Sequence, residues 1–219
     1  MKRLNILQRC LNSGVVAVVR GNSTEESYNT AIACIEGGVT SIELAFTAPH
    51  ADQTISKLAD KYSKNTAVVI GAGTVLDAPT ARLAILSGAE FIVSSSFNNE
   101  VAEICNLYQI PYMPGCQTPK EIQTALTAGV DIIKVFPAKI VGMGFFDAIK
   151  KGPLPHTNLM PTGGVNLDNM AEWFNHGAVL VGAGGNLTSP AATGNFAEVT
   201  KLAVQYHAEW ETIKKTITQ

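Results

Sequence analysis

The stretch AGVDIIKV (residues 128–135) decides the fold, because its pattern recurs along the chain. A small residue or His is followed by Gly, then by Val or Ala, and then by an apolar run. The glycine is typical of a helix C-terminus, where a left-handed backbone is least costly without a Cβ, and the apolar run predicts a strand buried on both faces. The pattern occurs in SGVVAVV (13–19), GGVTSIEL (37–44), SGAEFIV (87–93), AGVDIIKV (128–135) and HGAVLVG (176–182).

Three further strands fill the gaps between these units. They are TAVVIGAG (66–73) and the shorter, proline-containing IPYMPG (110–115) and NLMPTGG (158–164). Helical patterns lie between the strands, and STEES (23–27) and NLDN (166–169) supply N-cap signals. The predicted helices span residues 24–36, 50–63, 78–87, 98–107, 118–127, 142–151, 167–175 and 195–216.

Strict alternation of strands and helices predicts an α/β fold with a parallel sheet and right-handed crossovers. Eight such units in 219 residues favour a (β/α)8 TIM barrel, here preceded by an extra N-terminal helix. A doubly wound open sheet is the alternative. Because no linker or low-complexity stretch is visible, we expect residues 1–219 to form one domain.

The composition excludes several classes of protein. A formal net charge of −2 and the absence of a basic run argue against a nucleic-acid partner. No apolar run reaches the roughly 20 residues that a membrane span needs. Polar residues interrupt the N-terminal stretch 1–14, which favours an amphipathic helix over a signal peptide. Four widely spaced cysteines without a CxxC pair indicate reduced thiols, so we expect a cytoplasmic protein with no membrane partner.

Polar and glycine residues gather where the predicted strands end. In a (β/α)8 barrel the active site lies at these carboxyl ends, so the residues share one rim. In chain order they are Arg20, Glu43, Gly73–Thr74, Ser94, Pro114–Gly115, Lys134, Thr162–Gly163–Gly164 and Gly184–Gly185.

Lys134 is unusual because it interrupts an apolar strand. One interpretation is a strand-end lysine whose ammonium snorkels to solvent. The other is an amine that forms an imine with a ketone, since desolvation lowers the pKa of a lysine and the neutral amine is the nucleophile. Lys139 and Lys120 are weaker candidates, because they occupy loop or helix-start positions.

Two further charged residues belong to the rim. Glu43 either pairs with Arg20 or Lys134 for structure, or serves as a general acid/base beside the lysine. Arg20 is either a surface arginine or a bidentate clamp for a substrate carboxylate.

Two glycine-rich turns predict an anion site. MPTGGVNLDN (160–169) follows the seventh strand and VGAGGNLTS (181–189) follows the eighth. Backbone N–H groups and a helix N-terminus bind anions there, and these two loops are the usual phosphate position in such barrels. Tight turns without a ligand are the alternative.

No metal site is expected. The four histidines, His50, His156, His176 and His207, form no HxH or HxxxH pair. His50 is the histidine nearest the rim, and a helix-start role is its alternative. Cys116 lies on the rim without an evident base.

Five motifs carry a family resemblance. GGVTSIEL (37–44), IGAGTVL (70–76), PGCQTPKE (114–121), IKVFPA (133–138) and PTGGVNLDN (161–169) occur in the order typical of the 2-keto-3-deoxy-6-phosphogluconate (KDPG) aldolase family, which includes the 4-hydroxy-2-oxoglutarate (KHG) aldolases. The resemblance covers about residues 14 to 187. It implies a class I aldolase on a (β/α)8 barrel, usually a homotrimer, that needs no metal or other cofactor.

The resemblance also implies roles for the rim residues. Lys134 matches the Schiff-base lysine and Glu43 the catalytic glutamate, while Arg20 matches an arginine that contacts the substrate carboxylate in part of the family. The expected substrate-binding set is Arg20, Thr74, Pro114 and Gly115 around the pyruvyl group, and Thr162, Gly163, Gly164, Gly184 and Gly185 around the phosphate.

Three positions depart from the family pattern. Thr47 stands where many relatives have an arginine, Gly185 where a phosphate-binding serine is frequent, and Ser95 where an SP dipeptide is common. The predicted reaction is cleavage of 2-dehydro-3-deoxy-6-phosphogluconate to pyruvate and glyceraldehyde 3-phosphate. The alternatives are an aldolase for 4-hydroxy-2-oxoglutarate or for an epimeric or unphosphorylated 2-oxo-3-deoxy sugar acid, an isomerase or epimerase without an imine, and a phosphometabolite-binding barrel without catalysis.

Overall fold

The computed structural model describes residues 1–217, in which parallel strands alternate with helices. The strands form a six-stranded sheet of order β5-β4-β3-β2-β1-β9 and a three-stranded sheet of order β6-β7-β8. Every pairing within these sheets is parallel, which confirms the predicted α/β class. The strands are β1 Val15–Val19, β2 Ser41–Ala45, β3 Val69–Gly73, β4 Phe91–Val93, β5 Tyr112–Met113, β6 Gly115–Cys116, β7 Ile133–Val135, β8 Leu159–Pro161 and β9 Val181–Ala183.

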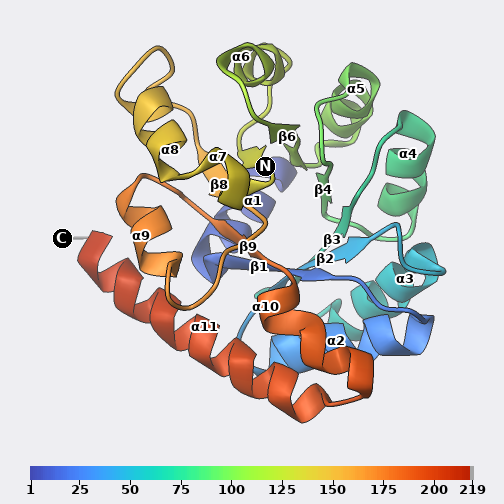
Figure 1. The fold of residues 1–219 in the computed structure, drawn as a ribbon. Coiled ribbons are helices and arrows are strands. Elements are labelled where there is room, and N and C mark those ends of the chain that lie inside the picture. Colours follow the sequence, from blue (N-terminus) through green and yellow to red (C-terminus); the bar gives the residue numbers. More distant parts are fainter. Residues whose placement is uncertain (218–219) are drawn as a thin grey trace.

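The helices surround the strands. Figure 1 shows the longer helices following one another around the sheets in chain order, with the N-terminal α1 and the short α7 and α10 nearer the centre. The helices are α1 Lys2–Ser13, α2 Thr24–Glu36, α3 Ala51–Tyr62, α4 Ala78–Leu86, α5 Asn99–Tyr108, α6 Pro119–Thr127, α7 Ala138–Val141, α8 Met143–Lys150, α9 Met170–Asn175, α10 Gly185–Thr188, the 3-10 helix η1 Ser189–Thr193, and α11 Phe196–Ile217.

Side-chain caps fix several helix starts. Ser23 caps α2 as its sequence predicts, and Thr118 forms a capping box with Glu121 at the start of α6. The signal in NLDN also forms a cap: the Asn166 side chain accepts from the backbone N–H of Asn169 at 3.0 Å, and the Asn169 side chain accepts from the backbone N–H of Asn166 at 2.9 Å. The α-helix itself begins later than expected, because α9 starts only after Asn169.

One predicted strand is divided in the structure, and one predicted helix has an additional short helix before it. The strand expected over 110–115 is interrupted at Pro114, which lacks an N–H group, and its halves pair with different sheets: β5 with β4, and β6 with β7. The helix expected over 142–151 is α8, and the structure adds the short helix α7 before it, separated from α8 by Gly142. Gly142 has φ +80°, a conformation that ends a helix.

The two sheets approach each other on both sides. On one side they are joined through Pro114. On the other, isolated parallel bridges link Leu159 to Ala178 and Thr162 to Gly182, between β8 and the segment that contains β9. The strands of both sheets therefore share an interior.

This interior is filled by apolar side chains. Every residue of β1, β2 and β3 is buried, and α1 adds Ile6 and Cys10 to the same cluster. Helix α1 therefore covers the amino ends of the strands. The cluster consists of Ile6, Cys10, Val16, Val69, Phe91, Val93, Met113, Ile132, Met160 and Leu180.

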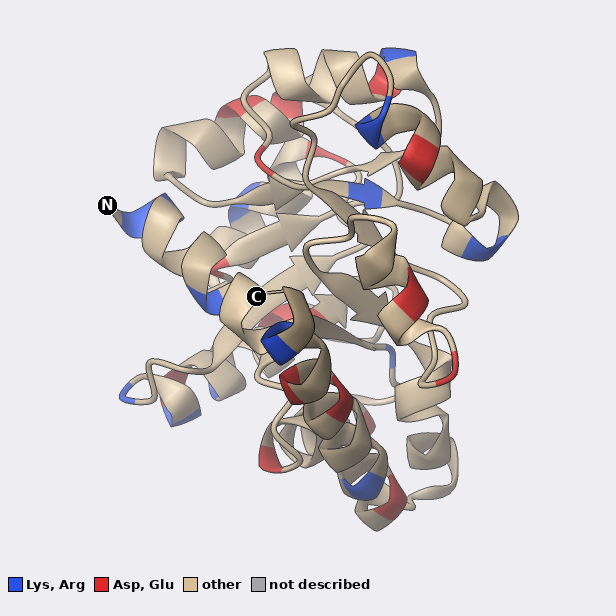
Figure 2. Ribbon diagram, turned by 90° about the vertical axis from the view of Figure 1, so that its left-hand side faces the viewer, with Lys and Arg blue, Asp and Glu red and all other residues tan. Residues whose placement is uncertain are grey.

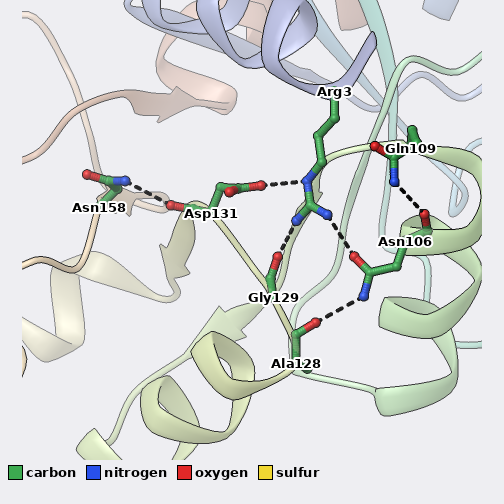
Figure 3. Close-up of polar contacts among 7 residues, drawn as sticks. All are labelled: Arg3, Asn106, Gln109, Ala128, Gly129, Asp131 and Asn158. Carbon is green, nitrogen blue, oxygen red and sulfur yellow. Dashed lines mark hydrogen bonds and ion pairs between the residues drawn. The ribbon is translucent and has the colours of Figure 1, made fainter. Parts of the chain in front are cut away.

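Arg3 anchors α1 on one side of the interior (Figure 3). Its guanidinium donates to Asp131 at 2.6 Å, to the Asn106 side chain at 2.7 Å, and to the Gly129 carbonyl. The Asn106 amide in turn donates to the Ala128 carbonyl at 3.0 Å. Every nitrogen of the Arg3 guanidinium therefore has a partner, either in α5 or in the loop that leads into β7.

Arg9 anchors α1 to a second set of loops. It donates to the carbonyl oxygens of Thr66 and Val68, just before β3, and forms an ion pair with Glu90, just before β4. The two arginines thus tie one short helix to loops from both sheets.

Charge is mixed on the molecular surface. Figure 2 shows basic and acidic residues interspersed along α11. Within residues 1–217, no helix combines the length and the apolar character required to cross a bilayer.

Candidate active site

Lys134 and Glu43 meet inside the molecule. Lys134 lies in the middle of β7 and Glu43 in β2, yet the lysine Nζ is 3.7 Å from the glutamate Oε1. Both residues are buried, with exposed fractions of 4% and 1%. The Lys134 ammonium therefore does not snorkel to solvent, and Glu43 pairs with Lys134 and not with Arg20, which is exposed.

The Glu43 carboxylate lacks hydrogen bonds. Neither of its oxygens has a donor among the residues that the structure describes. A buried polar group without partners is costly, and such groups in native proteins call for an explanation. The geometry leaves both oxygens free to accept a proton or a hydrogen bond from a bound molecule.

Gly73 makes room for this carboxylate. It lies at the end of β3, and a Cβ placed there would be 2.0 Å from Oε1 of Glu43. The next residue, Thr74, has φ +57°, which is rare for a β-branched side chain. Backbone strain of this kind collects at functional sites.

The surroundings of Lys134 combine apolar and backbone groups. Its Nζ lies 5.2 Å from the centroid of the Phe136 ring, and its backbone N–H donates to the Pro114 carbonyl at 2.9 Å. Gly115 is its register partner across β6 and β7. Pro114 and Gly115 are therefore immediate neighbours of the lysine.

A pocket of about 350 Å³ lies beside the buried pair. Thr162 borders it with 5% exposure and a hydroxyl that has no hydrogen-bond partner in residues 1–217. Gly182 leaves space for this hydroxyl, since a Cβ there would lie 2.3 Å away. Six of the predicted substrate-binding residues line this pocket: Arg20, Thr162, Gly163, Gly164, Gly184 and Gly185.

The predicted site therefore has two parts. Lys134 and Glu43 form a buried pair, and the glycine turns and Arg20 form an open pocket. Phe136 joins them, because its ring contacts the lysine Nζ and also lines the pocket. Thr74, Pro114 and Gly115 belong with the buried pair and are not among the pocket-lining residues.

The pocket residues that were not singled out from the sequence include Asn186, Thr188 and Ser189, which follow the second glycine turn. The Asn186 amide donates to the Val165 carbonyl at 2.8 Å and so ties the two turns together. The polar run NLTS directly after two glycines is the signal that would have found them.

Other chemistries fit the structure less well. Cys116 is buried, and desolvation, with a smaller contribution from Glu121, raises the pKa of its thiol to about 12, so it stays protonated. His50 precedes α3 with φ +51° and is a helix-start residue. No group of three His, Cys, Asp or Glu residues that could hold a metal occurs within residues 1–217.

Comparisons with known proteins agree with this geometry. A family model described as KDPG and KHG aldolase matches residues 6–202. The chain is 34% identical to 2-dehydro-3-deoxy-phosphogluconate aldolase of Treponema pallidum over 194 residues, which cover 87% of this chain and 90% of that protein. It is 30% identical to 2-dehydro-3-deoxy-6-phosphogalactonate aldolase of Escherichia coli over 173 residues, covering 79% and 83%.

A solved structure shows the same fold. The structure described as native KDPGal superposes with a TM-score of 0.84 at 27% identity, covering 92% of this chain and 96% of the other. Together with the family match over residues 6–202, this settles the relationship. The chain belongs to the KDPG and KHG aldolase family.

Proposed function

We propose that this protein is a class I aldolase that cleaves 2-dehydro-3-deoxy-6-phosphogluconate to pyruvate and glyceraldehyde 3-phosphate. The observation that carries the proposal is the buried pair of Lys134 and Glu43, 3.7 Å apart. The names of the Treponema pallidum and Escherichia coli relatives, both aldolases for phosphorylated 2-oxo-3-deoxy sugar acids, support it.

The first half of the reaction builds the imine. The neutral amine of Lys134 attacks the C2 ketone, and the carbinolamine takes up a proton and loses water to give a protonated imine. This cation accepts the electron pair of the C3–C4 bond, which a ketone would do poorly.

The second half needs a base and then an acid. Glu43, with two unbonded oxygens, takes the proton of the C4 hydroxyl while the C3–C4 bond breaks and the aldehyde leaves. The enamine that remains is protonated at C3, and hydrolysis of the imine releases pyruvate and restores the amine.

The remaining residues are proposed to position the substrate. Thr74, Pro114 and Gly115, next to the buried pair, line the pyruvyl end. The turns Gly163–Gly164 and Gly184–Gly185 offer backbone N–H groups to the phosphate, and Thr162 offers its hydroxyl, because its own N–H already donates to a carbonyl oxygen. Arg20 in the same pocket contacts an anionic group of the substrate.

A galactonate epimer is the second candidate substrate. The 30% identity to the Escherichia coli phosphogalactonate aldolase favours it. Gly185, which has no hydroxyl, also leaves open 4-hydroxy-2-oxoglutarate or an unphosphorylated acid as a substrate. Comparing kcat/KM for the two C4 epimers, each with and without the phosphate, separates these substrates.

We further propose that residues 1–219 form one closed (β/α)8 barrel domain with α1 as a plug, and that the protein is a cytoplasmic homotrimer. The contacts between the two sheets at both edges support closure. Leu83, Leu86 and Leu107 on the neighbouring helices α4 and α5 are 45%, 66% and 71% exposed, which supports self-association. Light scattering after size-exclusion chromatography tests the trimer, which should have a molar mass of about three chains.

Borohydride trapping tests the chemistry. Reduction in the presence of pyruvate should leave a stable 1-carboxyethyl group on the Lys134 nitrogen, located by peptide mass mapping. Neither the sample without pyruvate nor the Lys134→Met variant should carry it at that position. If no lysine is labelled, the imine mechanism is wrong, and an isomerase that uses Glu43 alone becomes the better proposal.

A further inference from the structure

The first glycine turn is fastened to the short helix that follows β7. The backbone N–H of Ala138 donates to the Thr162 carbonyl at 2.8 Å, and that of Lys139 donates to the Gly163 carbonyl at 3.0 Å. These two hydrogen bonds attach the start of α7 to the turn, so the Lys139 side chain begins beside the turn.

The stem of Lys139 lies across Gly164. A Cβ placed on Gly164 would be 2.7 Å from the Lys139 Cβ and 3.4 Å from its Cγ and Cδ. Gly164 has φ +92°, so a side chain at this position would be strained as well as crowded. The absence of a side chain at Gly164 therefore lets the stem of Lys139 pack along the turn.

The positive charge of Lys139 is not neutralised. Within residues 1–217, neither Lys139 nor Arg20 has a carboxylate within 4.0 Å. The acidic residue of the substrate pocket is Glu26, and one of its oxygens accepts both the backbone and the side-chain N–H of Asn22. Two unpaired cations thus flank the turns, which favours an anion between them.

The space around Lys139 continues into the substrate pocket. Lys139 lines a second pocket of about 700 Å³, and this pocket shares Gly164, Gly185 and Asn186 with the first. A lysine ammonium is a compact charge on a flexible stem with three donors, so it can turn toward an anion on either side of Gly164.

We propose that Lys139 is a specificity-determining residue that selects phosphorylated over unphosphorylated substrates. Its ammonium reaches over Gly164 and pairs with the phosphate held by the Gly163–Gly164 turn, in a pocket where Gly185 contributes no side chain. The inference rests on the proposed aldolase function and adds a residue to its phosphate site.

Steady-state cleavage by Lys139→Gln tests the proposal. KM for the phosphorylated substrate should rise about tenfold, the change expected from losing one hydrogen bond to a charged group, while kcat stays within about twofold. KM for the unphosphorylated sugar acid should not change. Lys139→Arg, which keeps the charge, should restore most of the affinity, and Lys57→Gln, an equal change of charge on the exposed face of α3, should do nothing.

Ionic strength and inorganic phosphate provide a second readout. Added salt should raise KM for the phosphorylated substrate more in the wild type than in Lys139→Gln. The reason is that salt screens the attraction between the Lys139 ammonium and the phosphate, which the variant has already lost. Inorganic phosphate should inhibit the variant more weakly.

Two outcomes overturn the proposal: an unchanged KM, or an equal rise for both substrates, which would indicate a disturbed turn. If Lys139→Gln does not fold, Lys139→Met, which keeps the stem, is measured in the same way. Failure of the aldolase assignment itself is distinct, because the wild type would then cleave neither substrate and would not be trapped by borohydride.

Discussion

The two ends of the strands differ in how their charged side chains are paired. At the amino ends, Arg3 and Arg9 place every guanidinium nitrogen against a carboxylate, an amide or a backbone carbonyl (Figure 3). At the carboxyl ends, Glu43 has two oxygens without a donor in the described chain, and its contact with Lys134 is 3.7 Å long.

The difference separates structure from chemistry. A charge whose hydrogen-bonding capacity is filled contributes to stability and has nothing left to offer a ligand. A buried charge that lacks hydrogen-bond partners lowers stability, and such a charge is retained where a bound molecule supplies the missing partners. Four substitutions break or sharpen this comparison.

Removing the amine should have the largest effect. In Lys134→Met, the nucleophile is lost and cleavage should fall at least about 10³-fold, the scale seen when a covalent catalyst is removed. Pyruvate release under saturating substrate measures it. Lys120→Met, at an exposed position on α6, is the matched control and should keep full activity. Substantial turnover by Lys134→Met would contradict the assignment.

Crowding the carboxylate should have the next largest effect. In Gly73→Ala, the new Cβ would lie 2.0 Å from Oε1 of Glu43, so the carboxylate must move and kcat should fall about 10²-fold or more. Overpacking should also lower the free energy of unfolding by about 1–3 kcal/mol. The control is Gly144→Ala, where a Cβ meets nothing within 4 Å. An unchanged kcat in Gly73→Ala would argue against the role of Glu43.

The amino end should respond in stability alone. Arg9→Met leaves Glu90 and the carbonyls of Thr66 and Val68 without their donor, and the free energy of unfolding should fall by about 2–3 kcal/mol. Urea denaturation measures this loss. The kcat should stay within about twofold of wild type, and the exposed Lys2→Met on the same helix should change neither quantity. A large loss of kcat in Arg9→Met would show that the two ends are coupled.

The thiols should give the smallest effect. Burial raises the pKa of Cys10, Cys34, Cys105 and Cys116 to about 12, so at pH 8 only roughly one thiol in ten thousand is ionised. The native protein should therefore react with a disulfide reagent far more slowly than the denatured one, and Cys116→Ser should keep its activity. Rapid labelling of Cys116 in the folded protein would reopen a nucleophilic role.

The sequence predicts the repeated parts of this fold best. Helix-ending glycines before apolar runs located the strands, and strand ends located Lys134 and Glu43, because parallel strands bring their carboxyl ends to one edge. The local pattern could not show that β5 and β6 pair with different sheets at Pro114, since strand pairing is a long-range property.

The missed features depend on which side chains meet in space. Arg3 and Arg9 looked like ordinary polar residues of an amphipathic helix, and their partners lie 57 to 128 positions away. Lys139 was set aside as a loop lysine, because only the structure brings its stem across Gly164. Whether Glu43 pairs with Arg20 or Lys134 was likewise open until the strands were arranged.

Gly73 has a consequence for how this enzyme can diverge. The Glu43 carboxylate can occupy its position only while residue 73, which faces it on β3, has no side chain. A substitution at 73 therefore displaces the carboxylate even where Glu43 itself is unchanged. A descendant that gained a methyl group at 73 would keep the glutamate codon yet lose the use of its carboxylate. When paralogues are sorted into active and inactive, position 73 is therefore as informative as position 43.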